Sequence, residues 1–240
     1  MQATMEPRSL PFVERRGRHA DGRMGRRAAN DWLLALRHAQ VPFDPDDRLL
    51  LLYGHQLVFR LGLYAATERV LDGEPVLYVD GANTFDPFVI GRLARAHRQQ
   101  PREVLSMIHV ARAFTCHQME RLVSDCLGAA LERYQARIAI LSGLFDTFYD
   151  QSVPEAETLR LFGRMMESIR RLTQQGHTLV CLCPPAPILT RTSRRCLDQL
   201  RGQADRVIHV QEGQGQGLVK LEEEGNTAGR CWEITSSALE

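Results

Sequence analysis

The sequence predicts an α/β fold in which a mainly parallel sheet has helices on both faces and an antiparallel hairpin near its carboxyl end. Short, continuous apolar runs alternate along the chain with longer stretches whose apolar residues recur at helical spacing. Near the end, residues 206–211 and 218–222 form two strand-like runs on either side of a glycine-rich turn. Alternating strands and helices favour parallel pairing because parallel strands need a crossover, whereas a short turn favours an antiparallel pair.

The expected strands are short apolar runs without polar alternation, which is typical of strands buried on both faces. They are residues 49–53, 75–79, 107–110, 137–141 and 178–183, then the hairpin of 206–211 with 218–222, and a last edge strand at 231–235. Pro184 and Pro185 end the fifth strand, because proline cannot donate to a sheet ladder.

Capping residues and apolar spacing predict the helices between these strands. Asp86 and Pro87 suit the N-cap and first position of a helix that runs to about residue 98. Thr115 caps the next helix, and a long helix over about 155–174 stops at Gly176. The apolar faces are Met119, Leu122, Val123, Cys126 and Ala130 in the second of these helices, and Leu159, Phe162, Met166 and Ile169 in the third.

The first residues differ in composition from the rest of the chain. Residues 1–29 combine glycine and proline with the arginines Arg15, Arg16, Arg26 and Arg27, which predicts a basic flexible arm ahead of a core domain at 30–240. The formal net charge is +1. No apolar run approaches the roughly 18 residues that a membrane span needs, and the scattered cysteines suit a reducing compartment. We therefore expect a cytoplasmic protein without membrane contact.

Two blocks in the middle of the chain carry a family resemblance. Residues 76–87 read Val-Leu-Tyr-Val-Asp-Gly-Ala-Asn-Thr-Phe-Asp-Pro, residues 108–114 read Ile-His-Val-Ala-Arg-Ala-Phe, and residues 117–119 read His-Gln-Met. The chain resembles the RadA/Rad51 recombinases, in which a strand ending in Asp-Thr-Glu-x-Thr-Phe-x-Pro precedes a strand with Ala-Arg-Ala-Phe and a helix that starts near His-Gln. The resemblance covers roughly residues 23–236 and implies a RecA-like core.

It also implies a nucleotide site in which several family residues are replaced. Gly54 opens the turn after the first strand, but Phe59 stands at the last glycine of the phosphate loop. Arg60 stands at the phosphate-binding lysine, and Leu61 at the hydroxyl residue that holds magnesium. A phenylalanine side chain obstructs backbone amides from wrapping a phosphate, so this turn is a degenerate phosphate loop.

Family residues are also replaced after the second and fourth strands. Asp80 ends the second strand, Ala82 replaces the glutamate that activates water, and Ser142 replaces the metal-facing aspartate. These replacements predict a pseudo-ATPase without catalytic residues, cofactor or metal, although Asp146 is an alternative metal contact. ATP binding without hydrolysis stays open, with Arg60 on a phosphate and Arg112 on the base.

The cysteines offer no convincing metal site. Cys116 is adjacent to His117, and adjacent residues seldom bind one ion together. Cys181 and Cys183 are expected to point to opposite faces of their strand. We therefore expect structural cysteines.

Arginines gather where the second DNA-facing loop of the family falls, after the strand at 178–183. The group comprises Arg191, Arg194, Arg195 and Arg201, with hydroxyl residues between them. Arginine and hydroxyl side chains neutralise and hydrogen-bond phosphates, but a solvated helix face explains the same residues. The arginines of the arm are alternative contacts for DNA or an acidic partner.

Three functions follow as alternatives. The first is a non-hydrolysing recombinase paralogue that supports DNA recombination or repair by binding a partner recombinase, single-stranded DNA or both. The second is a protein-only regulator on a RecA-like scaffold, such as an inhibitor of a polymerising partner. The third is an unusual residual ATPase.

Overall fold

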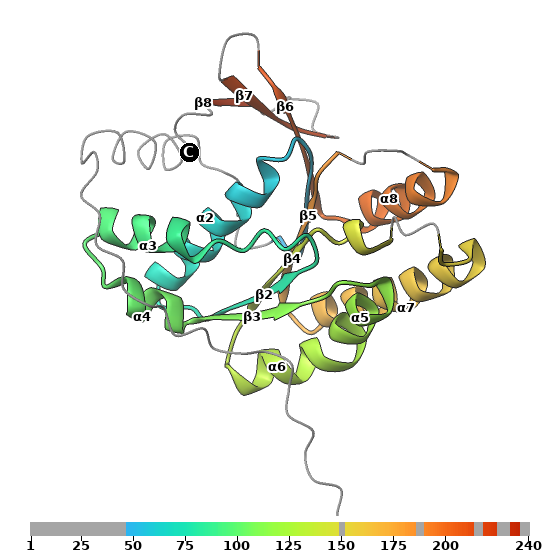
Figure 1. Cartoon of the computed structure of the whole chain (residues 1–240), viewed down its shortest axis with the longest axis horizontal. Coiled ribbons are helices and arrows are strands. Elements are labelled where there is room, and N and C mark those ends of the chain that lie inside the picture. Colours follow the sequence, from blue (N-terminus) through green and yellow to red (C-terminus); the bar gives the residue numbers. More distant parts are fainter. Residues whose placement is uncertain (1–46, 149–151, 186–189, 214–217, 225–230, 236–240) are drawn as a thin grey trace, which may run out of the picture.

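The computed structural model describes residues 47–148, 152–185, 190–213, 218–224 and 231–235, and its centre is one eight-stranded sheet (Figure 1). The strands are β1 (Leu49–Gly54), β2 (Val76–Asp80), β3 (Ile108–Arg112), β4 (Ile138–Ser142), β5 (Thr178–Cys183), β6 (Arg206–Glu212), β7 (Leu218–Glu223) and β8 (Cys231–Thr235). Their order across the sheet is β3-β2-β4-β5-β1-β6-β7-β8. The predicted boundary between arm and core, at residues 29 and 30, lies outside the described residues.

The predicted fold class is confirmed. Strands β1 to β6 pair in parallel, and β7 pairs with β6 and β8 in the antiparallel sense. Each predicted strand coincides with an observed one to within one or two residues at its ends. No helix in the described ranges is both long and apolar enough to cross a membrane.

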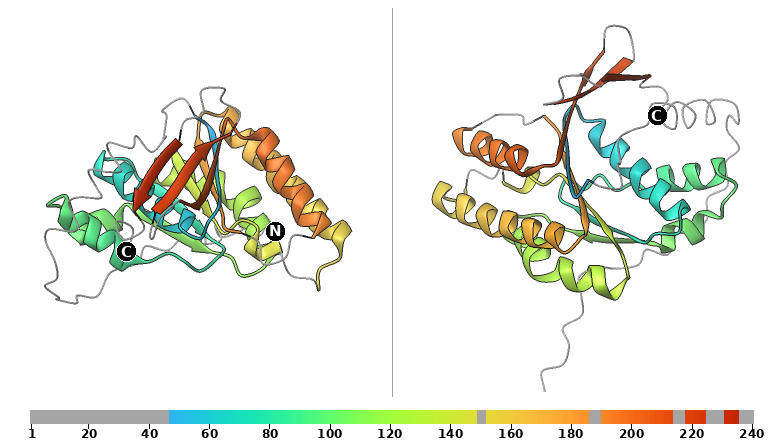
Figure 2. Two further views of the ribbon diagram at one scale, coloured as in Figure 1. Left: turned by 90° about the horizontal axis from the view of Figure 1, so that it is seen from above. Right: turned by 180° about the vertical axis from the view of Figure 1, so that it is seen from behind.

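The helices form two layers, one on each face of the sheet (Figures 1 and 2). One layer consists of α2 (Val58–Leu71), α3 (Pro87–Ala96) and α4 (Pro101–Ser106). The other consists of α5 (Cys116–Arg121), α6 (Leu127–Arg133), α7 (Glu155–Gln174) and α8 (Arg191–Gln203). A π-helical turn (Leu122–Cys126) joins α5 to α6, and a 3-10 turn (Asp146–Phe148) follows β4.

The continuous apolar strands are explained by burial on both faces. In β1, Leu50 and Leu52 belong to the core beneath α2 to α4, whereas Leu49 and Leu51 belong to the core beneath α5 to α8. Successive side chains of a strand point to opposite faces, so both layers need apolar residues from every central strand.

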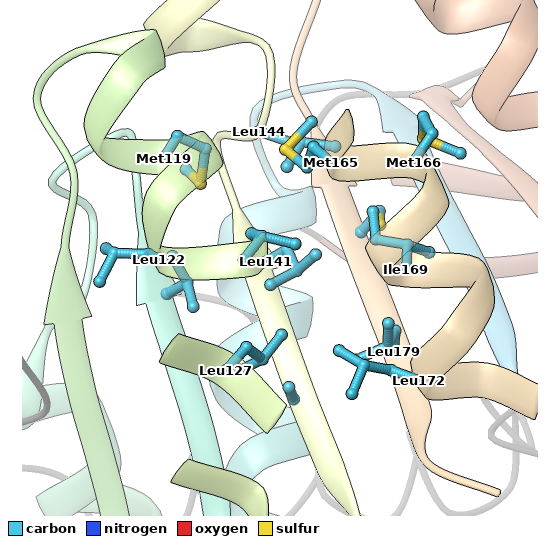
Figure 3. Packing of buried hydrophobic residues seen from close by; sticks show 14 of the residues in the cluster. Met119, Leu122, Leu127, Leu141, Leu144, Met165, Met166, Ile169, Leu172 and Leu179 are labelled. Atoms are coloured by element: carbon cyan, nitrogen blue, oxygen red, sulfur yellow. The ribbon is translucent and has the colours of Figure 1, made fainter. Parts of the chain in front are cut away.

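The second core is closed by helices that meet over β4 and β5. Figure 3 shows Met119 and Leu127 from the α5–α6 segment, Met165 and Ile169 from α7, and Leu141 from β4 packed together. The apolar face predicted for the helix after Thr115 is buried or half-buried here.

The end of α3 differs from the prediction. The helix stops at Ala96 rather than near residue 98, and Arg98 has a positive φ of 60° that breaks the helical path. Pro101 then begins the short helix α4, which was not predicted because six residues are too few to show helical apolar spacing. The result is a compact helical corner over the edge of the sheet formed by β2 and β3.

Gly62 sets the distance between α2 and the sheet. A Cβ at this position would stand 2.1 Å from Leu182 Cδ1 of β5, and Leu182 is fully buried. We predict that Gly62→Val lowers the free energy of unfolding by about 1–3 kcal/mol, because the added methyl groups overpack a filled core. Urea denaturation of the full chain measures it.

The matched control is Gly163 in α7, where a Cβ would meet nothing within 4 Å. Gly163→Ala is expected to raise the free energy of unfolding by up to about 1 kcal/mol, because alanine is the better helix former. Equal effects of the two substitutions would show that α2 is not held closely against β5.

Candidate functional site

Three of the predicted site residues meet where neighbouring strands end. Asp80 of β2 is in register with Arg112 of β3 on one side and with Ser142 of β4 on the other. Gly54 lies apart from them, because β5 separates β4 from β1. The candidate site therefore has two parts, an Asp80 cluster and the turn that joins β1 to α2.

The Asp80 carboxylate is the centre of the first part. Its side chain is fully buried and accepts hydrogen bonds from the backbone N–H of Thr84 (2.9 Å) and of Phe85 (3.1 Å). Arg112 Nε donates to the same carboxylate at 3.2 Å. Arg112, expected to stack on a base, is thus held by an internal partner.

The loops after β2 and β4 lie directly on one another beside this cluster. Gly81 N–H donates to Ser142 O at 2.7 Å, and the hydroxyls of Thr84 and Ser142 are 3.2 Å apart. Gly143 has a positive φ of 66°, and a Cβ there would stand 2.4 Å from Ala82 Cβ. The loop after β4 therefore approaches Ala82 closely, and only a glycine fits at position 143.

Tyr78 completes the floor of the cluster. Burial raises the pKa of Tyr78, while the neighbouring Ser142 and Thr84 hydroxyls oppose that rise. The ring also packs edge-on against Phe85, with ring centroids 5.1 Å apart. The predicted position of a metal-facing aspartate is thus occupied by a small hydroxyl residue within a packed hydroxyl network.

The second part of the site is a tight turn stabilised by its own backbone. Gly54 has a φ of 114°, and a Cβ there would stand 2.4 Å from Val210 O of β6. Most amides that follow have internal acceptors. The hydrogen bonds are His55 N–H to Val210 O (2.8 Å), Leu57 N–H to His55 Nδ1 (3.2 Å), Val58 N–H to His55 O (3.1 Å), Phe59 N–H to Gln56 O (3.2 Å) and Leu61 N–H to Leu57 O (3.0 Å).

The predicted phosphate-loop residues point elsewhere. Phe59 packs against the core beneath α2, and Leu61 is buried within it. Arg60 hydrogen-bonds the hydroxyl of Tyr64, one helical turn further on. Burial raises the pKa of Tyr64, and the charges of Arg60 and Arg92 oppose this rise, so both guanidinium groups lie near the phenol.

The predicted DNA-binding arginines separate into two groups. Arg191, Arg194 and Arg195 are exposed in the first turns of α8 and form no ion pair with any described residue. Thr190 caps this helix by accepting from Ser193 N–H at 3.1 Å. Three like charges at a helix N-terminus oppose the helix dipole, so they do not stabilise α8.

Arg201, at the other end of α8, is engaged internally. It forms an ion pair with Glu224, and its guanidinium Cζ lies 5.2 Å from the centroid of the Tyr53 ring. Tyr53 donates to Glu224 and stacks on His209 with 4.7 Å between centroids. Burial and then the Glu224 carboxylate raise the pKa of Tyr53 to about 12. No local pattern indicates this network, because its members are far apart in the chain.

The remaining predictions have mixed outcomes. Arg15, Arg16, Arg26 and Arg27 lie outside the described residues. The expectation that Cys181 and Cys183 point to opposite faces is wrong, because residues two apart on a strand share a face, and both belong to the core beneath α5 to α8. Among the described residues, no group of three or more His, Cys, Asp or Glu side chains is placed to hold a metal ion.

A comparison with protein families gives a match over the middle of the chain. The model of the Rad51 family matches residues 55–183, which is just over half of the chain. The matched region runs from His55, directly after β1, to the end of β5, so it includes the Asp80 cluster and the turn that follows Gly54.

We predict that Asp80→Ala lowers the free energy of unfolding by about 3–5 kcal/mol, because it leaves the Arg112 guanidinium and two backbone N–H groups without their buried acceptor. Chemical denaturation measures it. Asp86→Ala is the matched control: it removes only the N-cap of α3, at a cost of about 1 kcal/mol. Equal losses in the two variants would contradict a central role of Asp80.

Proposed function

The chain belongs to the Rad51 family, and on that premise we propose that it is a non-hydrolysing accessory protein in DNA recombination or repair, which binds a partner recombinase, DNA or both. The observation that carries the proposal is the turn between β1 and α2. Most of its backbone N–H groups donate to acceptors within the chain, and a phosphate-binding loop needs such groups to point at the ligand.

The side chains around this turn support the same proposal. Phosphoryl transfer relies on positioned positive charge, a metal held by hydroxyl and carboxylate groups, and a residue that orients water. At the corresponding positions this chain has Leu61 in the core, Ser142 bonded to Thr84, and Ala82 against Gly143. Arg60 is positively charged, but its guanidinium bonds to Tyr64 along α2.

Binding surfaces then account for the function. The exposed arginines of α8 suit contacts with DNA phosphates, which give affinity without reading sequence. Within the described residues the sheet ends at β3 on one side and β8 on the other, and an edge strand offers unpaired backbone groups to another chain. A partner recombinase and a DNA strand can therefore use different parts of the molecule.

We expect no ATP hydrolysis above the no-enzyme rate when the purified chain is incubated with magnesium, ATP and single-stranded DNA in a phosphate-release assay. Hydrolysis that Arg60→Ala removes would contradict the proposal, since a contaminating ATPase would not respond to that substitution. The combined substitutions Phe59→Gly, Arg60→Lys, Leu61→Thr and Ala82→Glu are also expected to give no turnover. Ser142 remains in that variant, and the hydrogen bonds from Thr84 and Phe85 to Asp80 keep the loop after β2 in its present conformation.

We further expect the α8 arginines to determine the salt dependence of DNA binding. Each phosphate contact to a single strand contributes about 0.7 to the slope of log K against log salt. Replacing Arg191, Arg194 and Arg195 with alanine should therefore make the slope shallower by about 2. Fluorescence anisotropy with a labelled oligo(dT), measured over a series of salt concentrations, gives this slope.

The control removes three other exposed arginines, Arg121, Arg133 and Arg137, and should leave the slope unchanged. Arg201→Ala should also have a small effect, because that guanidinium is paired with Glu224. If the unsubstituted chain binds no oligonucleotide at low salt, the DNA arm of the proposal is wrong and the protein-only regulator is the better description.

A further inference from the structure

The outer side of α3 has an aromatic residue beside arginines. Phe88, Arg92 and Arg95 are exposed and recur at the i, i+4 and i+7 positions that share one side of a helix. Phe88 is 69% exposed, which makes it one of the two most exposed large apolar side chains among the described residues. We call these three residues the α3 stripe.

The stripe carries two positive charges, and the nearest acid in its own segment is Asp86, whose carboxylate caps the helix by accepting from Phe88 N–H at 2.8 Å. Helix α3 contains no Asp or Glu, and Arg92 and Arg95 form no ion pair with any described residue. Arg60 of α2 lies near Tyr64 together with Arg92, so a second helix adds a guanidinium group to the same region. Arg98 and Arg102 follow in the adjacent corner, where Glu103 is the one acidic residue of α4.

The composition of the stripe is that of a protein interface. Aromatic residues and arginine are enriched at the centres of such interfaces, whereas lysine and acidic residues are depleted. The spacing i, i+4, i+7 is also the one along which a second helix packs. A strand of nucleic acid suits the stripe less well, because such strands bind in grooves with several stacking side chains and α3 offers one.

We propose that the α3 stripe is a docking surface for an acidic amphipathic helix of a protein partner. An apolar side chain of that helix contacts Phe88, and its carboxylates pair with Arg92 and Arg95. The inference rests on the proposed function and deepens it, since it states the chemistry by which the partner is bound. Helix α3 and helix α8 cover opposite faces of the sheet, so this surface is separate from the α8 arginines (Figure 2).

The test uses the full chain and synthetic helical peptides. Two labelled peptides carry one leucine and two glutamates at the spacing i, i+4 and i+7. In one peptide the leucine comes first, and in the other the order of the three residues is reversed. Each peptide has a scrambled control of identical composition. We expect one of the two peptides to bind at least about five-fold more tightly than its scrambled control, because a single anchor residue of an interface contributes about that much to affinity. Phe88→Ala, and separately Arg92→Glu with Arg95→Glu, should each weaken that binding about five-fold or more. All three side chains are exposed, so thermal unfolding should show intact folding.

A charge exchange makes the test specific. The Arg92→Glu, Arg95→Glu variant should prefer a peptide whose two glutamates are replaced by lysine, whereas Arg121→Glu with Arg137→Glu, the matched control, should not. Equal binding of ordered and scrambled peptides, or no binding of either, would overturn the inference. It would equally be overturned if oligo(dT) bound more tightly than the peptides and lost affinity on Phe88→Ala, because the stripe would then be a nucleic-acid surface.

The failures of the two proposals are distinguishable. Peptide binding that ignores the α3 substitutions removes this inference but leaves the absence of hydrolysis and the α8 arginines in place. ATP turnover by the unsubstituted chain removes the proposed function, whatever the peptides do.

Discussion

The buried carboxylate of Asp80 is the constraint on which the carboxyl edge of the sheet depends. A charge taken out of water is tolerated only when it is paired and hydrogen-bonded. Asp80 meets that condition with two backbone N–H groups of its own loop and with Arg112 of the neighbouring strand. The loop must therefore pass over the strand end in one conformation, and that conformation places Ala82 against Gly143. The hydrogen bonds and the ion pair of Asp80 thus hold the loop after β2 against the ends of β3 and β4.

Most polar groups of the same edge have partners within the chain. In a nucleotide-binding protein, unpaired amides at a helix N-terminus bind the phosphate, and charged side chains bind the phosphate and the metal. Here most of the amides after Gly54, and the hydroxyls of Ser142 and Thr84, have partners within the chain. A polar group that is already satisfied gains little from a new ligand, because binding would exchange one hydrogen bond for another. These internal hydrogen bonds stabilise the fold, and they are the basis on which we propose that the chain does not hydrolyse ATP.

The sequence predicted the strands well because burial on both faces leaves a plain signal, a short run without polar residues. It did not predict features that depend on contacts between residues far apart in the chain. Arg201 was grouped with the other arginines of α8 by spacing, yet its partner Glu224 follows β7, and no local pattern connects them. The π-helical turn at Leu122–Cys126 inserts a residue without changing the apolar pattern, so spacing alone could not reveal it. For the site, the roles assigned to its residues stay predictions, and the internal partners of Asp80, Arg60 and Arg112 became visible only in three dimensions.

The near-neutral charge of the chain conceals a separation of basic surfaces. The α3 stripe and the α8 arginines lie in different helical layers, on opposite faces of the sheet. Two helices of about 10 Å diameter with a sheet between them put the outer surfaces more than roughly 20 Å apart. That distance exceeds the Debye length of about 8 Å at physiological salt, so the field of one surface scarcely reaches the other. Occupation of one basic surface therefore leaves the electrostatic attraction of the other nearly unchanged, which is the property that a protein needs to hold two different partners at once.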